Sequence, residues 1–260
     1  MARLQSLLQL EELSVSFSVP LPRPSAEGEL LNKRGTPVTL RNPKHLTFVG
    51  VSAYLESLLA QIETPFLERL NITLFMQIDF AFPHLSCFLN ITEKIKSHLL
   101  VVGFGHNVVS ITTRSTPIDE CFVLHVRCRQ LDWQIECAAQ VCSAIMHTPL
   151  LAGVELLGLE FDEKAMPEEW QDGEIDARTW HEFLRSFIRV KTLHVCCSLS
   201  EELSRAFEGD EIGSDPGFLP DLQAIVNGSN KSASLFLSFI HTRQVANRPV
   251  RQWWLPLLEH

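Results

Sequence analysis

The chain has 260 residues, of which 45% are hydrophobic and 20% are charged, so its composition is that of a globular protein rather than a disordered one. A chain of this length buries about 70–75% of its unfolded surface on folding and needs neither a disulfide nor a metal ion to hold its core. Its 22 basic and 31 acidic residues give a net charge of -9, which repels phosphate backbones and anionic lipids. We therefore expect neither nucleic acid nor a membrane as a partner.

Two further features bear on the compartment. No stretch approaches the ~20 consecutive apolar residues of a membrane helix, and Glu11 and Glu12 stand where the apolar part of a signal peptide would lie. The seven cysteines are odd in number and contain no C-x-x-C spacing, which is typical of reduced thiols packed as small apolar side chains. We expect a cytoplasmic or nuclear protein.

A phrase of the form L-x-x-L-x-L recurs along the chain in altered form, and each occurrence predicts a short strand with one apolar face. Its occurrences are Leu10, Leu13, Val15; Pro43, Leu46, Phe48; Leu67, Leu70, Ile72; Leu151, Val154, Leu156; and Val190, Leu193, Val195. A strand with one apolar face is unstable alone, so such units stack on their neighbours and build a continuous core, as leucine-rich repeats do.

The N-terminal part predicts one complete repeat. A first strand is expected within residues 4–19, followed by a proline-rich and glycine-containing loop near 20–40. A one-sided apolar stripe over 54–62 predicts a helix with Ser52 as its cap, and another helix is expected over 83–89.

The middle of the chain changes to strand patterns over 99–104, 108–113 and 121–126, to which no repeat phase can be assigned. Residues 103–107 resemble a phosphate loop in their glycines, but no lysine follows, so a hairpin turn is the favoured interpretation. A strong helical stripe follows over 131–145.

The C-terminal part predicts a strand over 151–161 and then an acidic insertion over 162–176, read as a solvated loop or a docking site for a basic partner. A helix capped by Asp176 is expected over 180–188, then a strand over 190–196 and a short helix capped by Ser200. A weaker apolar phrase, a last helix over 235–240 and an apolar tail that caps the open end of the stack complete the chain.

Longer blocks at residues 45–56, 130–134, 180–193, 239–244 and 248–250 resemble the C-terminal part of F-box proteins, which are numerous in mushroom-forming fungi. The resemblance implies a leucine-rich part that holds a protein destined for ubiquitination. In that family an N-terminal F-box docks on the adaptor of a cullin-type ubiquitin ligase. The Leu-Pro-x-Glu opening of an F-box is absent from this sequence, so the adaptor is expected as a partner only if an F-box lies upstream.

The intervening residues of the L-x-L phrases predict the partner-binding surface. They are small or polar, differ between repeats and would lie side by side on the outer side of the strands. These residues are Ser14, Thr47, Asn71, Glu155 and His194. A merely solvated sheet face is the alternative.

Catalytic and metal motifs are incomplete. Ser52 lies in half of a G-x-S-x-G motif, and His181-Glu182 lacks the second histidine of H-E-x-x-H. The adjacent Cys196 and Cys197 predict one core and one exposed side chain on a strand, with His194 beside Cys196 as a minor candidate for a reactive thiol pair.

We predict an α/β fold, an irregular leucine-rich-repeat-like solenoid with parallel strands on one face and helices on the other. It would be a single domain over residues 1–260 with loop insertions near 20–40 and 162–176. The expected function is non-catalytic protein recognition by a monomer without cofactor or metal. The alternatives are a repeat scaffold or orphan interaction protein without a ubiquitin connection, and a hydrolase or transferase that uses Cys196 and His194.

Overall fold

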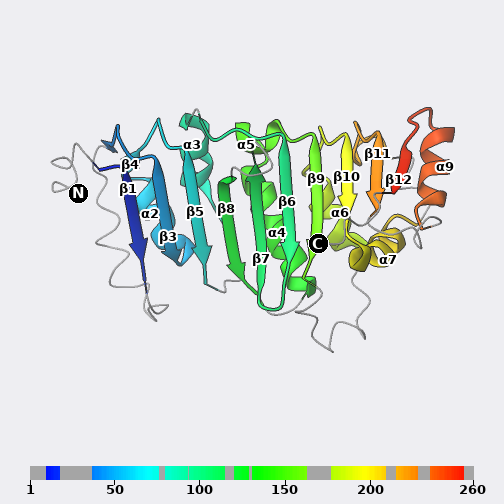
Figure 1. Cartoon of the computed structure of the whole chain (residues 1–260), viewed down its shortest axis with the longest axis horizontal. Helices are drawn as coiled ribbons and strands as arrows, with labels where there is room; N and C mark the ends of the chain where they lie inside the picture. Colours follow the sequence, from blue (N-terminus) through cyan, green and yellow to red (C-terminus); the bar gives the residue numbers. More distant parts are fainter. Residues whose placement is uncertain are drawn as a thin grey trace.

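The computed structural model describes residues 10–17, 37–75, 80–92, 94–114, 120–128, 131–162, 177–208, 215–227 and 235–254. They form an α/β protein in which ten strands make one open, mixed and mostly parallel sheet (Figure 1). A second sheet of two strands contains β2 (Val38–Thr39) and β4 (Ile62–Glu63).

Parallel strands make up both ends of the large sheet. On the N-terminal side these are β1 (Glu12–Ser16), β3 (His45–Gly50) and β5 (Arg69–Leu74). On the C-terminal side they are β9 (Leu156–Phe161), β10 (Thr192–Val195), β11 (Ala224–Asn227) and β12 (Arg251–Trp254). At each end the order of strands across the sheet follows their order in the chain.

The centre of the sheet is an antiparallel meander, which corrects the prediction that all strands run parallel. It contains β6 (Leu99–Phe104), β7 (Val108–Arg114) and β8 (Glu120–Arg127), with β6 beside β9 and β8 beside β5. A turn at residues 105–107 joins β6 to β7, and a parallel pair would have needed a crossover of a dozen residues or more. The predicted hairpin is therefore confirmed, and it explains why no repeat phase fits these residues.

Helices cover one face of this sheet. The described helices are α2 (Ser52–Leu59), α3 (Pro83–Ile91), α4 (Leu131–Ile145), α5 (Pro149–Ala152), α6 (Ala177–Leu184), α7 (Cys197–Ala206) and α9 (Leu237–Val245). In Figure 1, α2, α3, α4 and α6 lie behind the strands, so the opposite face is turned toward the viewer. We call that opposite face the strand face.

The core lies between the strands and the helices. Alternate residues of the strands point into the core and form registered rows. In one such row Leu46, Leu70 and Phe122 lie side by side on β3, β5 and β8, and each has an exposed fraction of 1% or less. Trp180 of α6 is fully buried and packs edge-on against Phe104 of β6 at 5.8 Å between ring centroids. The L-x-L phrases thus predicted the inward rows of β3, β5 and β10 correctly.

Two predicted helix caps were wrong. Val51 and Cys196 are the cap residues of α2 and α7, whereas Ser52 is the first residue of its helix and Ser200 lies within α7. Ser200 instead donates its hydroxyl to the Cys196 carbonyl at 2.9 Å, a bond to the preceding turn.

The paired cysteines are also placed differently from the prediction. Because β10 ends at Val195, Cys196 and Cys197 do not occupy opposite faces of a strand, and both are half-buried at the start of α7. Similarly, residues 149–152 form the helical turn α5 rather than the start of a strand. Pro149 suits the first turn of a helix, and this shortens the following strand to β9.

An aromatic cluster closes the C-terminal end of the core. Phe207 packs against Phe218, Phe236 and Phe239, with ring centroids between 4.7 and 5.7 Å apart. The start of the predicted capping tail forms strand β12 beside β11, and residues 255–260 lie outside the described residues. The loop at 18–36, the insertion at 163–176 and the Asp176 cap lie outside the described residues.

Candidate functional site

Outward-facing residues form a straight row across the strand face because neighbouring strands pair in register, and the row is polar at its two ends and buried at its centre. Ser14 of β1 lies opposite Thr47 of β3, and Thr47 lies opposite Asn71 of β5. The row continues to His194 of β10 through residues of β8, β7, β6 and β9, which are Val123, Thr112, Val101 and Gly158. Four of the five residues predicted from the sequence therefore share one row.

Glu155 does not belong to that row, so its predicted placement was wrong. It precedes the first residue of β9, and its carbonyl accepts hydrogen bonds from the N–H groups of Lys191 and Thr192 at 2.8 and 3.0 Å. The phrase was assigned to the wrong register, since Leu157 and Leu159, not Val154 and Leu156, are the inward pair of β9. Glu155 stands at the amino end of the strand instead.

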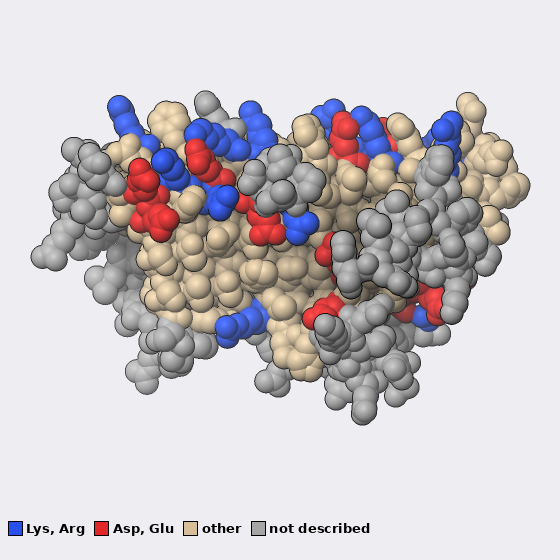
Figure 2. Space-filling model, in the orientation of Figure 1, with Lys and Arg blue, Asp and Glu red and all other residues tan. Residues whose placement is uncertain are grey.

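Charged side chains gather along this amino edge of the sheet. Figure 2 shows Lys, Arg, Asp and Glu along the upper border of the strand face and an uncharged region below them, on the side of β1, β3 and β5. Neighbouring edge positions form the exposed ion pairs Lys44–Glu11 at 3.5 Å, Lys94–Glu68 at 2.6 Å and Lys191–Glu155 at 2.8 Å. Exposed pairs of this kind contribute about 0–1 kcal/mol each, so they mark the border of the face rather than hold the fold.

A second row, which the sequence did not single out, lies beside the first. It runs through Val49, Thr73, His125, Ser110 and Gly103 on β3, β5, β8, β7 and β6. The Ser110 hydroxyl donates to the Gly103 carbonyl at 3.3 Å, and a Cβ atom at Gly103 would lie only 2.6 Å from that hydroxyl. The apolar alternation within β6, β7 and β8 indicates which residues face outward. Which strands pair with one another is not readable from the sequence, so these residues could not be predicted to form a row.

Two histidines on the strand face are half-buried. Burial lowers the pKa of His125 and of His194, while Glu120 and Glu160 respectively act in the opposite direction. At neutral pH both imidazoles are therefore uncharged, and each offers one hydrogen-bond donor and one acceptor. The two imidazoles are thus polar and uncharged, whereas exposed Glu160 of β9, opposite Gly103 in the second row, carries a charge on the same face.

The geometry at Cys196 does not favour a nucleophile. Burial raises the pKa of this thiol to about 11, so it is protonated at neutral pH. The thiolate is the reactive form of cysteine, and activation would require the opposite shift. Among the described residues, no group of three or more His, Cys, Asp or Glu side chains is placed to hold a metal ion.

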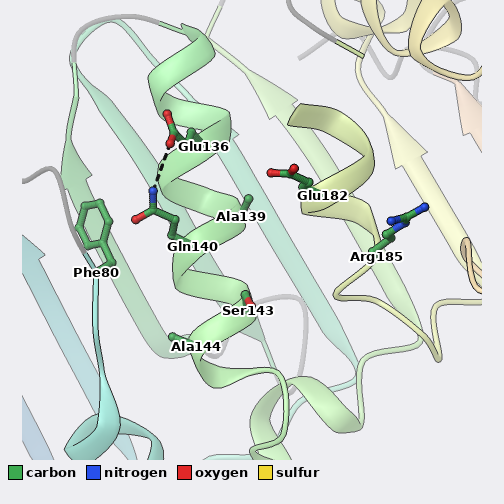
Figure 3. A pocket seen from close by; sticks show the side chains of 8 residues that line it. All are labelled: Phe80, Glu136, Ala139, Gln140, Ser143, Ala144, Glu182 and Arg185. Carbon is green, nitrogen blue, oxygen red and sulfur yellow. Dashed lines mark hydrogen bonds between the residues drawn. The ribbon is translucent and has the colours of Figure 1, made fainter. Parts of the chain in front are cut away.

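A shallow groove lies on the opposite, helix-bearing side, with α4 as its floor (Figure 3). Its volume is about 690 Å³, and its lining residues are Phe80, Glu136, Ala139, Gln140, Ser143, Ala144, Glu182 and Arg185. In Figure 3 Glu182 points toward α4 and Arg185 points away from it, toward Asp215, with which it forms an ion pair at 3.2 Å. These residues come from separate parts of the chain, so no sequence motif could have predicted the groove.

Comparisons with protein-family models, curated proteins and solved structures found no match for this chain. Of the helices described, none combines the length and the apolar character required to cross a lipid bilayer.

Proposed function

We propose that this chain is a non-catalytic recognition domain that binds a partner protein across the strand face. The observation that carries the proposal is the registered row Ser14, Thr47 and Asn71 on β1, β3 and β5, with His194 in the same row on β10, beyond four strands whose residues in the row are buried. These side chains are exposed or half-buried, and none of them is charged at neutral pH. An extended sheet face with varied polar groups suits the recognition of a folded protein better than the binding of a small molecule.

The proposal includes a finer description of the fold as a leucine-rich-repeat-like solenoid of irregular repeat length. Support comes from the sequential parallel strands at both ends of the sheet. Register partners are 33 residues apart from Leu13 to Leu46, 24 from Leu46 to Leu70, 36 from Leu157 to Leu193 and 32 from Leu193 to Ile225. The central meander interrupts this succession, so the repeats form two short runs.

Within this function, we place the chain as the substrate-binding part of an F-box subunit of a cullin-type ubiquitin ligase. The blocks that resemble F-box proteins support this role, and the strand face supplies a surface for the client protein. Sequencing the natural transcript upstream of Met1 tests it. An open frame encoding a helical Leu-Pro-x-Glu module supports the ligase role, whereas an in-frame stop codon directly upstream leaves a repeat scaffold without a ubiquitin connection.

Substitutions on the strand face test the recognition role. Thr47→Arg and Asn71→Arg place bulky cations at the N-terminal end of the row, on β3 and β5, and we expect each to weaken partner binding at least about tenfold. The matched control is Ser143→Arg, which adds the same side chain at an exposed site of α4 on the other side of the sheet. Proteins captured by the wild-type chain would be quantified by mass spectrometry, and circular dichroism would confirm that each variant is folded.

Two results would contradict the strand face as the binding surface. One is unchanged capture by folded Thr47→Arg and Asn71→Arg variants. The other is loss of capture in the Ser143→Arg variant alone, which would move the binding surface to the α4 groove.

A further inference from the structure

The α4 groove lies between Phe80 on one side and α6 on the other, and its floor is the outer side of α4 (Figure 3). Three of its floor residues, Ala139, Ser143 and Ala144, have small side chains and lie on successive turns of the helix. Packed helices have axes about 8–10 Å apart, and the side chains at the contact set the distance. Small residues on the floor therefore allow another helix to lie close along α4.

The floor of the groove favours a helical occupant over an extended peptide. An extended peptide binds mainly by pairing its backbone with the free edge of a sheet. Here the floor is itself an α-helix, and over most of its length its N–H and C=O groups are paired within the helix. An extended peptide would leave its own backbone groups unpaired against this floor, whereas a helix pairs them internally and needs only side-chain contacts.

The groove carries negative charge on two sides. Glu182 of α6 points toward α4, and it takes part in none of the ion pairs that join described residues. Glu136 of α4 accepts a hydrogen bond from the uncharged Gln140 amide at 3.3 Å, which leaves the charge of the carboxylate in place. Arg185 points away from α4 and pairs with Asp215 at 3.2 Å. Charge complementarity therefore requires cations on the occupant.

An exposed tryptophan extends this surface toward the start of α4. Trp133 has an exposed fraction of 49% and lies three residues before Glu136, so the two residues share one side of the helix. Tryptophan is enriched among the residues that contribute most to protein–protein binding. Its indole offers the occupant a large apolar contact beside the groove.

We propose that the α4 groove, together with Trp133, binds an amphipathic helix of a partner protein. The apolar side of that helix packs on the small residues of α4, and its lysine or arginine side chains lie between Glu136 and Glu182. The groove is on the opposite side of the sheet from the strand face, so both surfaces can be occupied at the same time.

The test selects peptides from a display library on the folded full chain. The library holds randomised peptides of about 18 residues, enough for about five helical turns. Counter-selection on the Ser143→Arg variant, which fills the floor and adds a cation, removes peptides that bind elsewhere. We expect the recovered sequences to carry apolar residues at i, i+3, i+4 and i+7 with lysine or arginine beside them. A synthesised peptide of this kind should gain helical circular dichroism when it binds.

Calorimetric titration of that peptide measures the contribution of the charges and of the indole. We expect the double variant Glu136→Gln/Glu182→Gln to weaken binding at least about tenfold and Trp133→Ala to weaken it at least about fivefold. All three substitutions lie at the surface, and circular dichroism would confirm that the variants are folded.

The matched control is the double variant Glu201→Gln/Glu208→Gln, which removes the same charge from exposed sites on and after α7. This control and Thr47→Arg on the strand face should bind the peptide as the wild type does. Equal weakening in the groove and control double variants would overturn the proposal, because attraction to the net charge of -9 would then explain the binding. Recovery of acidic or proline-rich sequences, or of no peptide that distinguishes the wild type from Ser143→Arg, would do the same.

Discussion

Arg243 of α9 is a cation with no exposed surface, and its replacement should destabilise the C-terminal end of the fold. One of its terminal nitrogens donates to the Phe218 carbonyl at 3.0 Å, and the other donates to the carbonyls of Leu219 and Leu222 at 3.0 and 3.3 Å. Leu219 has a φ of 42°, in the left-handed region that a leucine adopts only at a cost of about 1–2 kcal/mol. The guanidinium therefore holds a strained turn in place.

The Arg243→Met variant keeps most of the side-chain length but removes these three hydrogen bonds. The Leu219 carbonyl keeps the Leu222 N–H at 3.1 Å and the Phe218 carbonyl keeps Arg248 at 3.4 Å, whereas the Leu222 carbonyl loses the guanidinium. A buried acceptor left without a partner costs about 1–3 kcal/mol, so we expect a net loss of about 2 kcal/mol. In a domain of this size that loss lowers the melting temperature by about 4–8 °C. Urea unfolding monitored by tryptophan fluorescence and by circular dichroism measures the change.

The control for this prediction is Arg205→Met on α7. Arg205 is exposed and forms an ion pair with Glu202 within its own helix, so its loss should cost less than about 1 kcal/mol. If the Arg243→Met variant is no less stable than the Arg205→Met variant, the three carbonyls do not depend on the guanidinium and the reasoning is wrong.

Two further predictions concern a carboxylate and a thiol. Glu56 of α2 accepts hydrogen bonds from the N–H groups of His84 and Leu85 at 2.6 and 3.0 Å and so caps α3 from a different helix. The Glu56→Ala variant should therefore lose about 1–2 kcal/mol of its free energy of unfolding, measured in urea. Burial raises the pKa of the Glu56 carboxyl above its ordinary value of 4.5, so the folded state binds the carboxyl proton more tightly than the unfolded state does. The free energy of unfolding, compared with that of a Glu56→Gln variant, should therefore rise as the pH falls toward 4.5. An equal difference between the two proteins at pH 7 and pH 5 would contradict this. Burial raises the pKa of Cys196 to about 11, so iodoacetamide should alkylate exposed Cys87 before Cys196 at pH 8. The alkylation rate of Cys196 should still be rising with pH at pH 10. Equal alkylation rates of the two thiols at pH 8 would refute this.

The sequence predicted those elements whose apolar period is long or strict. The stripe over 131–145 became α4, and the alternation in β3 and β5 placed Leu46 and Leu70 in one buried row. In these segments the local pattern and the packing require the same conformation, so the pattern alone is sufficient.

Prediction failed where packing decided between two locally similar patterns. Residues 149–152 follow a Thr-Pro sequence like that at residues 64–65, yet only residues 149–152 form a helix. The apolar residues that follow are compatible with two choices of which residues of β9 face the core. The pairing of β8 with β5, and hence the position of His125 on the strand face, depends on which strands meet in space. The burial of Arg243 is likewise invisible in sequence, because an arginine on a helix is ordinarily exposed.

The meander also determines when each edge of the sheet can be completed during synthesis. β5 and β6 follow each other in the chain but are separated in the sheet by two strands, β8 and β7. A growing chain therefore carries an unpaired edge on β5 until residues 120–127 have left the ribosome, and this edge can pair wrongly with other chains. Once β8 enters, it joins the N-terminal strands to the hairpin of β6 and β7, and the free edge of β6 becomes the template on which β9 and the remaining strands add in turn.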